Sequence, residues 1–157
     1  MQKPWNIPNI PVYSLATYAD GRANMNICTY VIPISMKPKL YAVAVYYNTK
    51  TFQNLLSSEF AVLQLLHSAH DKLVKKLGQN SGLQYDKEKY LSKKNLLTKW
   101  EGYTALQNTS AYILLKKCWN KPSGDHELFV FEAIKHKSFH NDYLSIQQLR
   151  DKKIIRG

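Results

Sequence analysis

The sequence predicts a mostly-β protein, a β-barrel with a helical insertion. Segments rich in β-branched and aromatic residues lie in both halves of the chain, and residues 68–77 between them have helical spacing. Closing such strands into a barrel removes exposed strand edges. At 157 residues the chain has the usual length of one domain, so we expect residues 1–157 to fold as a single unit.

The N-terminal part contains four segments with the composition of strands, which are residues 11–19, 24–34, 40–47 and 60–66. Asp20-Gly21 marks a turn between the first two segments, and Pro33 helps to end the second. Residues 40–47 are apolar on both alternating faces. This pattern is typical of a strand inside a barrel or at a subunit interface.

Helical signals separate these strands from those near the C-terminus. A short helix is expected over residues 51–58, with Thr49 or Thr51 as its N-cap. Residues 68–77 carry an apolar helical stripe that ends at Gly78. The remaining segments are, in order, a loop over 79–82, a charged helix or turn over 85–94, strands over 111–119 and 128–135 with a break at 121–124, and a less regular end over 145–155.

The formal net charge of +11 and the pI of about 9.6 raise the question of nucleic-acid binding. The excess is spread evenly, because residues 1–58, 59–110 and 111–157 carry +4, +3 and +4. Most lysine clusters lie beside carboxylates or at helical spacing, as on a solvated face. Zinc-finger spacing and the signature of an RNA-recognition sheet are absent, so nucleic acid is not the favoured partner.

The small number of cysteines and the lack of a long apolar run indicate the cellular compartment of the protein. Cys28 and Cys118 are too few for a disulfide framework, and we expect both to be small core residues rather than nucleophiles. No apolar run reaches the length of a membrane span, and residues 1–6 lack the apolar core of a secretory signal. We therefore expect a cytoplasmic protein that does not insert into a membrane.

Two histidine pairs have spacings that suit a helix face, and these are His67 with His70 and His136 with His140. Neither pair has a third ligand at a recognised spacing, so no metal site is expected. Nucleophile elbows, Walker loops and dinucleotide glycine motifs are also absent. This argues against a P-loop enzyme and a two-domain dehydrogenase.

Small polar residues gather at two places where the predicted strands begin or end. After the first turn they are Asn24, Asn26, Cys28 and Thr29. Residues 48–51, Asn-Thr-Lys-Thr, lie where a strand passes into a helix, and there backbone N–H groups, hydroxyls and a lysine can hold a phosphate. When the second group is considered alone, helix capping beside an exposed lysine is the better explanation. Gly124-Asp125-His126 has the composition of an ordinary hairpin turn.

These segments follow one another in the same order as in a known family, and this order is more informative than any single segment. The matching pieces are the Pro-led strand 11–18, the turn Asp20-Gly21…Asn24, the strand 26–35 with Pro38 after it, the segment 48–55, the strand 60–66, Cys118, the segment 124–129 and the tail 144–155. On these pieces the chain resembles the flavin reductase-like, FMN-binding split-barrel family. The Gly-Asp-His before a strand is the most specific of them. Phe131 stands where a glycine is common, and a single Pro38 stands where two prolines are usual.

The resemblance implies a split β-barrel of Greek-key type that holds FMN non-covalently at a homodimer interface. Residues expected to line the flavin ring are Asn24, Asn26, Cys28, Thr29 and Tyr30. Those expected at the ribityl chain and phosphate are Asn48, Thr49, Lys50 and Thr51, with Lys87 as a second phosphate or ring contact. His126 would lie near the reactive face of the flavin, beside nicotinamide or substrate, as the catalytic residue.

The implied activity is an NAD(P)H:flavin oxidoreductase, in which NADH or NADPH gives a hydride to N5 of FMN. Electrons would then pass to an unknown acceptor, such as a redox partner protein. A flavoredoxin-like electron carrier or sensor, which binds FMN without nicotinamide turnover, is a second hypothesis. The presence of Phe131 where the family commonly has glycine would suit this hypothesis. A basic nucleic-acid-binding barrel is a weaker hypothesis, and so is haem or pyridoxine-phosphate chemistry on a related barrel.

Overall fold

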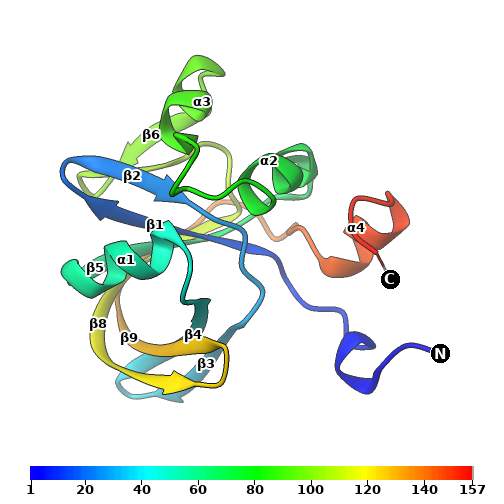
Figure 1. The fold of residues 1–157 in the computed structure, drawn as a ribbon, viewed down its shortest axis with the longest axis horizontal. Coiled ribbons are helices and arrows are strands. Elements are labelled where there is room, and N and C mark those ends of the chain that lie inside the picture. The colour runs from blue at the N-terminus through cyan, green and yellow to red at the C-terminus, as the bar shows by residue number, and fades with distance from the viewer. Residues whose placement is uncertain (157) are drawn as a thin grey trace.

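The computed structural model describes residues 1–156, and within them the chain is mostly β with four short α-helices (Figure 1). The strands are β1 (Tyr13–Ala19), β2 (Arg22–Met25), β3 (Val31–Met36), β4 (Lys39–Tyr46), β5 (Phe60–Leu65), β6 (Leu97–Trp100), β7 (Tyr103–Leu106), β8 (Ala111–Ser123) and β9 (His126–Ser138). The α-helices are α1 (Lys50–Ser57), α2 (Val74–Gly78), α3 (Lys87–Lys93) and α4 (Ile146–Asp151), and two 3-10 helices are η1 (Pro4–Asn6) and η2 (Ser68–Leu73).

Seven strands form one antiparallel sheet in the order β2-β1-β5-β8-β9-β4-β3. The sheet curls until the segment before β3 meets β1 (Figure 1). There Tyr13 and Cys28 exchange two backbone hydrogen bonds, at N–O distances of 2.9 and 2.8 Å. This bridge partly closes the barrel, which confirms the predicted mostly-β barrel.

Apolar residues form two clusters, one on each face of the sheet. On β5, Leu63 belongs to the cluster inside the barrel and its neighbour Val62 to the outer cluster, as strand alternation requires. Phe129 and Phe131 fill the barrel interior, with ring centroids 6.0 Å apart. The outer cluster lies under η2, α2, α3 and the β6–β7 hairpin, so the helical insertion covers one face of the barrel.

The predicted strand over residues 24–34 is wrong in its extent, because it consists of two strands, β2 and β3. Asn26 explains the interruption. Its side-chain Oδ1 accepts the hydrogen bond of Leu15 N at 2.7 Å, in place of a backbone partner. Apart from the bridge at Cys28, no strand resumes until Val31, and residues 26–30 line a cavity.

The predicted break at residues 121–124 is also wrong, because β8 runs on to Ser123. β5 pairs with β8 only as far as Lys116, so the outer part of β8 is an edge with one partner, β9. Pro122 has no N–H, and proline is tolerated where that side of a strand has no partner. Pro122 pairs across the hairpin with Glu127.

The β6–β7 hairpin was not predicted from the sequence. Its two-residue turn is Glu101-Gly102, with φ of 50° and 80°. Both residues adopt the left-handed conformation that a tight hairpin turn of this kind needs. A glycine between short β-forming runs was the available signal.

The remaining helices follow the sequence prediction approximately. The expected helix over 68–77 begins as η2 and becomes α2, and α3 occupies most of 85–94. Near the C-terminus α4 lies against the N-terminal segment, where Ile146 N donates to Ile10 O at 3.0 Å. No helix among residues 1–156 has both the length and the apolar character that crossing a membrane requires.

Candidate functional site

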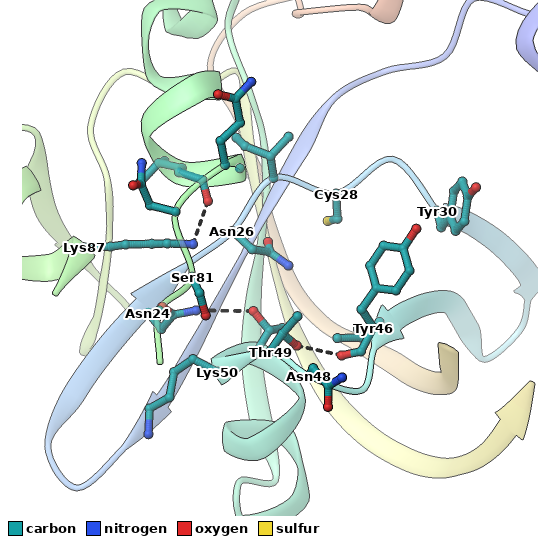
Figure 2. A pocket seen from close by; sticks show the side chains of 18 of the residues that line it. Asn24, Asn26, Cys28, Tyr30, Tyr46, Asn48, Thr49, Lys50, Ser81 and Lys87 are labelled. Atoms are coloured by element: carbon teal, nitrogen blue, oxygen red, sulfur yellow. Dashed lines mark hydrogen bonds between the residues drawn. The ribbon is translucent and has the colours of Figure 1, made fainter. Parts of the chain in front are cut away.

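A cavity of about 480 Å³ lies where β2, β4, α1 and the loop after α2 meet (Figure 2). Its volume falls in the usual range for small-molecule sites, about 300–1,000 Å³. All eleven residues expected from the sequence to contact flavin or substrate line it, namely Asn24, Asn26, Cys28, Thr29, Tyr30, Asn48, Thr49, Lys50, Thr51, Lys87 and His126. The structure therefore brings together segments that are separated by up to a hundred positions in the sequence.

The junction between β4 and α1 forms one wall. Thr49 is the N-cap of α1, as expected, and its Oγ1 accepts the hydrogen bond of Phe52 N at 3.1 Å. The same hydroxyl donates to Tyr46 O at 2.7 Å. The first backbone N–H groups of a helix have no partner within it, so this wall presents donors and the positive end of the helix dipole.

Two asparagines hold the adjoining wall in place. Asn24 is buried, and its Nδ2 donates to Thr51 Oγ1 at 3.2 Å. Asn26 uses its Oδ1 for Leu15 N, as described above, which leaves its Nδ2 as a donor beside the cavity (Figure 2). Each amide is thus oriented by a second element, which preorganises the wall.

Cys28 contributes a small apolar surface rather than a reactive group. Burial raises the pKa of its thiol to about 12, so the sulfur stays protonated at physiological pH. The prediction that it is no nucleophile agrees with this environment.

Lys87, at the start of α3, is the buried cation of the site. The residue is 5% exposed, and its Nζ donates to Leu77 O at 2.6 Å. Burial lowers the pKa of this ammonium from 10.5 to about 8. The residues that line the cavity include no aspartate or glutamate, so within the described part of the chain the cavity offers this charge no carboxylate. An anionic ligand group would supply the missing counter-charge.

Lys50 lies differently from Lys87. Figure 2 shows its side chain extending away from Asn26 and Lys87, although the residue lines the same cavity. Gly82 packs against it, because a Cβ added at Gly82 would lie 2.9 Å from Lys50 Cβ and 2.2 Å from Asn24 Oδ1. The loop after α2 therefore approaches this wall so closely that only glycine fits.

His126 lies at the other end of the cavity, at the start of β9. It is 7% exposed, and its ring packs against that of Tyr46 with centroids 3.8 Å apart and an interplanar angle of 36°, with the Tyr30 ring at 5.2 Å. Its Nδ1 lies 2.6 Å from Asp125 Oδ1. Because a carboxylate accepts, neutral His126 carries its hydrogen on Nδ1, which leaves Nε2 as the free nitrogen.

The family assignment follows from a comparison of the whole sequence. Residues 9–147 match the family described as flavin reductase like domain. The chain belongs to the flavin reductase-like family. No curated protein sequence matches it.

Solved structures share the fold of this flavin reductase-like protein. An FMN-binding protein from Thermus thermophilus, with 1-cyclohex-2-enone bound, gives a TM-score of 0.77 at 19% identity, over 88% of this chain and 75% of that chain. Flavoredoxin from Methanosarcina acetivorans gives 0.76 at 17% identity, over 94% and 82%. An NADH:FAD oxidoreductase from Streptomyces globisporus, in complex with NAD and FAD fragments, gives 0.74 at 15%, over 88% and 80%. These similarities establish the split-barrel fold.

The flavin reductase-like chain has cavity residues that its sequence did not reveal. They include Tyr46, whose ring packs against that of His126, and the loop residues Gly78, Gln79, Asn80, Ser81 and Gly82. Residues 79–82 were expected only to be a loop. Two glycines flanking three polar residues were the available signal, since such loops can bring backbone N–H groups close to a ligand.

Three expectations about other residues have clear outcomes. Cys118 was expected in the core, and this is wrong, because it is exposed at an irregularity in the β8–β9 pairing. Phe131 is buried in the barrel interior and does not line the cavity, so its departure from the family pattern leaves the site untouched. Among residues 1–156 there is no cluster of three potential metal ligands.

Proposed function

We propose that this flavin reductase-like protein binds FMN in the cavity and acts as an NAD(P)H-dependent flavin reductase. The observation that carries the proposal is the buried ammonium of Lys87 in a cavity with no carboxylate lining. A phosphate monoester supplies the missing negative charge, and a charge-assisted hydrogen bond to it is among the stronger polar contacts. FMN therefore fits the residues present.

The cavity residues divide into two groups with different tasks. At one end Lys87 and the first N–H groups of α1 would hold the phosphate, with the Thr49 and Thr51 hydroxyls beside the ribityl chain. Lys50 would reach the phosphate by turning back from the position that Figure 2 shows. At the other end Asn26 and Cys28, with Asn24, Thr29 and Tyr30 around them, would line the flat ring. Asn48 lies next to the Thr49 cap, at the β4–α1 junction.

His126 is the residue we assign to the reactive end. When bound, FMN supplies a ring that accepts a hydride from a reduced nicotinamide. Asp125 and Tyr46 hold the imidazole in one orientation, so Nε2 can accept a hydrogen bond from the nicotinamide amide or another substrate group. The role proposed for His126 is to position the substrate, because hydride transfer to the flavin needs no protein acid or base.

We further propose that the protein is a cytoplasmic homodimer of one-domain subunits. Three apolar side chains on the edge strand β3 are well exposed, and they are Ile32 at 60%, Ile34 at 50% and Met36 at 82%. An exposed apolar edge strand is a liability in a monomer and suits a subunit interface. The two cysteines are free thiols, in keeping with a reducing compartment.

The visible spectrum of the purified protein, before and after NADH or NADPH is added without oxygen, tests the function. Flavin absorbance that bleaches with either nucleotide is the expected result. Colourless protein that also fails to bind added FMN would contradict the flavin site. A yellow protein that neither nucleotide bleaches would contradict the reductase hypothesis and support the FMN-binding electron carrier. A parallel titration with FAD measures the preference for FMN.

A further inference from the structure

A second cavity of about 370 Å³ lies away from the flavin cavity, with no lining residue in common. Its walls come from the β6–β7 hairpin, the connection over residues 107–109, the start of β8 and the end of β9. The proposed flavin reductase function makes no use of it.

Aromatic rings form one side of this cavity. Trp100 stacks on Tyr112 with centroids 5.2 Å apart and an interplanar angle of 28°, and Phe139 meets Tyr112 edge-on at 5.5 Å. Tyr112 is 4% exposed and its hydroxyl donates to Leu106 O, so the ring cannot turn away. Trp100 and Phe139 are more exposed and offer flat faces on which a planar ring can stack.

Polar groups of the connection over residues 107–109 lie beside these rings. Thr109 is 1% exposed, and its hydroxyl lies within hydrogen-bond reach of the Tyr112 hydroxyl. It therefore helps to fix the Tyr112 ring in this wall and is not itself open to a ligand. Asn108 lines the same wall and is exposed, so its side-chain amide is open to a ligand.

Two lysines supply positive charge at the cavity. Lys99 Nζ donates to Thr104 Oγ1 at 2.8 Å, and Lys137 Nζ lies 5.3 Å from the centroid of Phe139. Neither forms an ion pair with a carboxylate of the described residues, whereas the nearby Glu101 is paired with Lys135 at 3.0 Å. No acidic residue lines the cavity, so both ammonium groups are available to an anion.

The connection that carries Asn108 and Thr109 is held rigidly from both sides. Gln107 N donates to Leu96 O at 2.8 Å and Gln107 O lies 2.9 Å from His70 Nε2. Ser110 N donates to Leu65 O, and Ser110 O accepts from Phe139 N, each at 2.8 Å. The cavity is therefore formed before any ligand arrives, which lowers the entropic cost of binding.

We propose that this second cavity binds a nucleoside monophosphate. The base would stack on Trp100, as bases stack on aromatic side chains elsewhere. The Asn108 amide would meet polar atoms of the base or ribose, and Lys99 and Lys137 would hold the phosphate. A flat heteroaromatic ring, hydroxyls and a dianion in one small molecule match all three sets of groups.

Adenosine 5′-monophosphate, titrated into the isotope-labelled protein saturated with FMN, tests this by NMR. The Trp100 indole N–H signal should move in a saturable way, while those of Trp5 and Trp119 stay in place. Lys137→Gln should weaken binding about tenfold, as loss of one charged contact predicts. Lys121→Gln, an exposed lysine at the far end of β8, is the matched control and should leave the affinity unchanged. Asn108→Gly keeps the backbone conformation, because φ at this position is 58°, and removes only the side-chain amide, so the fold should survive while the affinity falls.

Four results would overturn the proposal. A Trp100 signal that does not respond, or equal affinities of wild type and Lys137→Gln, would exclude the site. Adenosine or inorganic phosphate binding as tightly as the nucleotide would exclude the combined recognition of base and phosphate. A single-stranded oligonucleotide that binds much more tightly, with a steep dependence on salt, would make the ligand a polymer. The same titration, repeated without FMN, distinguishes failure of this proposal from failure of the proposed flavin site, because the Trp100 signal does not depend on flavin.

Discussion

Replacing Lys87 by methionine is expected to change flavin affinity and stability in opposite directions. The pKa of Lys87 falls from 10.5 to about 8 because the ammonium is buried. At about 1.4 kcal/mol per unit of pKa, discounted for solvent screening, carrying this charge costs the ligand-free protein about 2–3 kcal/mol. Loss of the hydrogen bond to Leu77 O offsets about 1 kcal/mol of the gain. The net stabilisation of about 1–2 kcal/mol should raise Tm by about 2–8 °C.

The same substitution removes a charged contact to the phosphate. Such contacts contribute about 1.5–3 kcal/mol, so the Kd for FMN should rise about 10- to 150-fold. Quenching of FMN fluorescence measures the Kd, and calorimetry of the flavin-free protein measures Tm. Lys89→Met, an exposed lysine two positions along α3, is the control and should change neither. Lys50→Met should weaken FMN less than Lys87→Met, since the Lys50 side chain extends away from Lys87 (Figure 2).

The pH dependence gives a further check on Lys87. Because the pKa of Lys87 is lower in the folded protein than in the unfolded chain, the buried charge destabilises the fold by its full amount below pH 8. This destabilisation disappears as the pH rises from about 8 towards 10.5, the pKa in the unfolded chain. The stability advantage of Lys87→Met should therefore shrink over that window. FMN affinity of the wild type should fall above pH 8, because binding must then take up a proton. A variant with unchanged FMN affinity, or with lower Tm, would refute the reasoning.

Three more outcomes are expected. His126→Ala should keep its FMN affinity while reduction by NAD(P)H slows about tenfold, the equivalent of one hydrogen bond of about 1.5 kcal/mol, and loss of FMN from the folded variant would disprove the positioning role. Gly82→Ala should weaken FMN binding and cost about 1–3 kcal/mol of stability, because the new Cβ would meet Asn24 Oδ1 at 2.2 Å, and an unchanged fluorescence titration would argue against this wall. Burial tends to raise the pKa of Asp71, but Lys152, whose Nζ lies 2.6 Å from its Oδ2, outweighs this and lowers it. Asp71→Asn should therefore lower Tm at pH 7 and lose this effect as pH falls below the folded pKa, whereas a deficit that persists at low pH would point to packing instead.

The sequence was sufficient to predict strands in both halves of the chain, although not all of their bounds, and to predict the strand-to-helix junction of the cavity. These features are local, because Thr49 caps α1 through contacts within three residues. The split between β2 and β3 depends instead on Asn26 reaching Leu15, eleven positions away, and no local pattern encodes that contact. For the same reason the sequence could not show that Tyr46 would lie on the ring of His126, since strand register decides it.

Lys87 shows most clearly what composition leaves out. A net charge of +11 spread evenly along the chain suggested that the lysines lie on a solvated surface. This holds for the other described lysines, since none of them is buried. Lys87 differs only because α3 folds back over β2 and places it beside Leu77, under the loop that Gly82 closes. An uncompensated buried charge lowers stability, and a methionine of similar length would avoid this cost. The cavity that holds the charge also lacks any carboxylate. Both features are explained together if the counter-charge arrives with the ligand, so the residue that is least favourable to the stability of the flavin-free protein would become the strongest contact to the flavin phosphate.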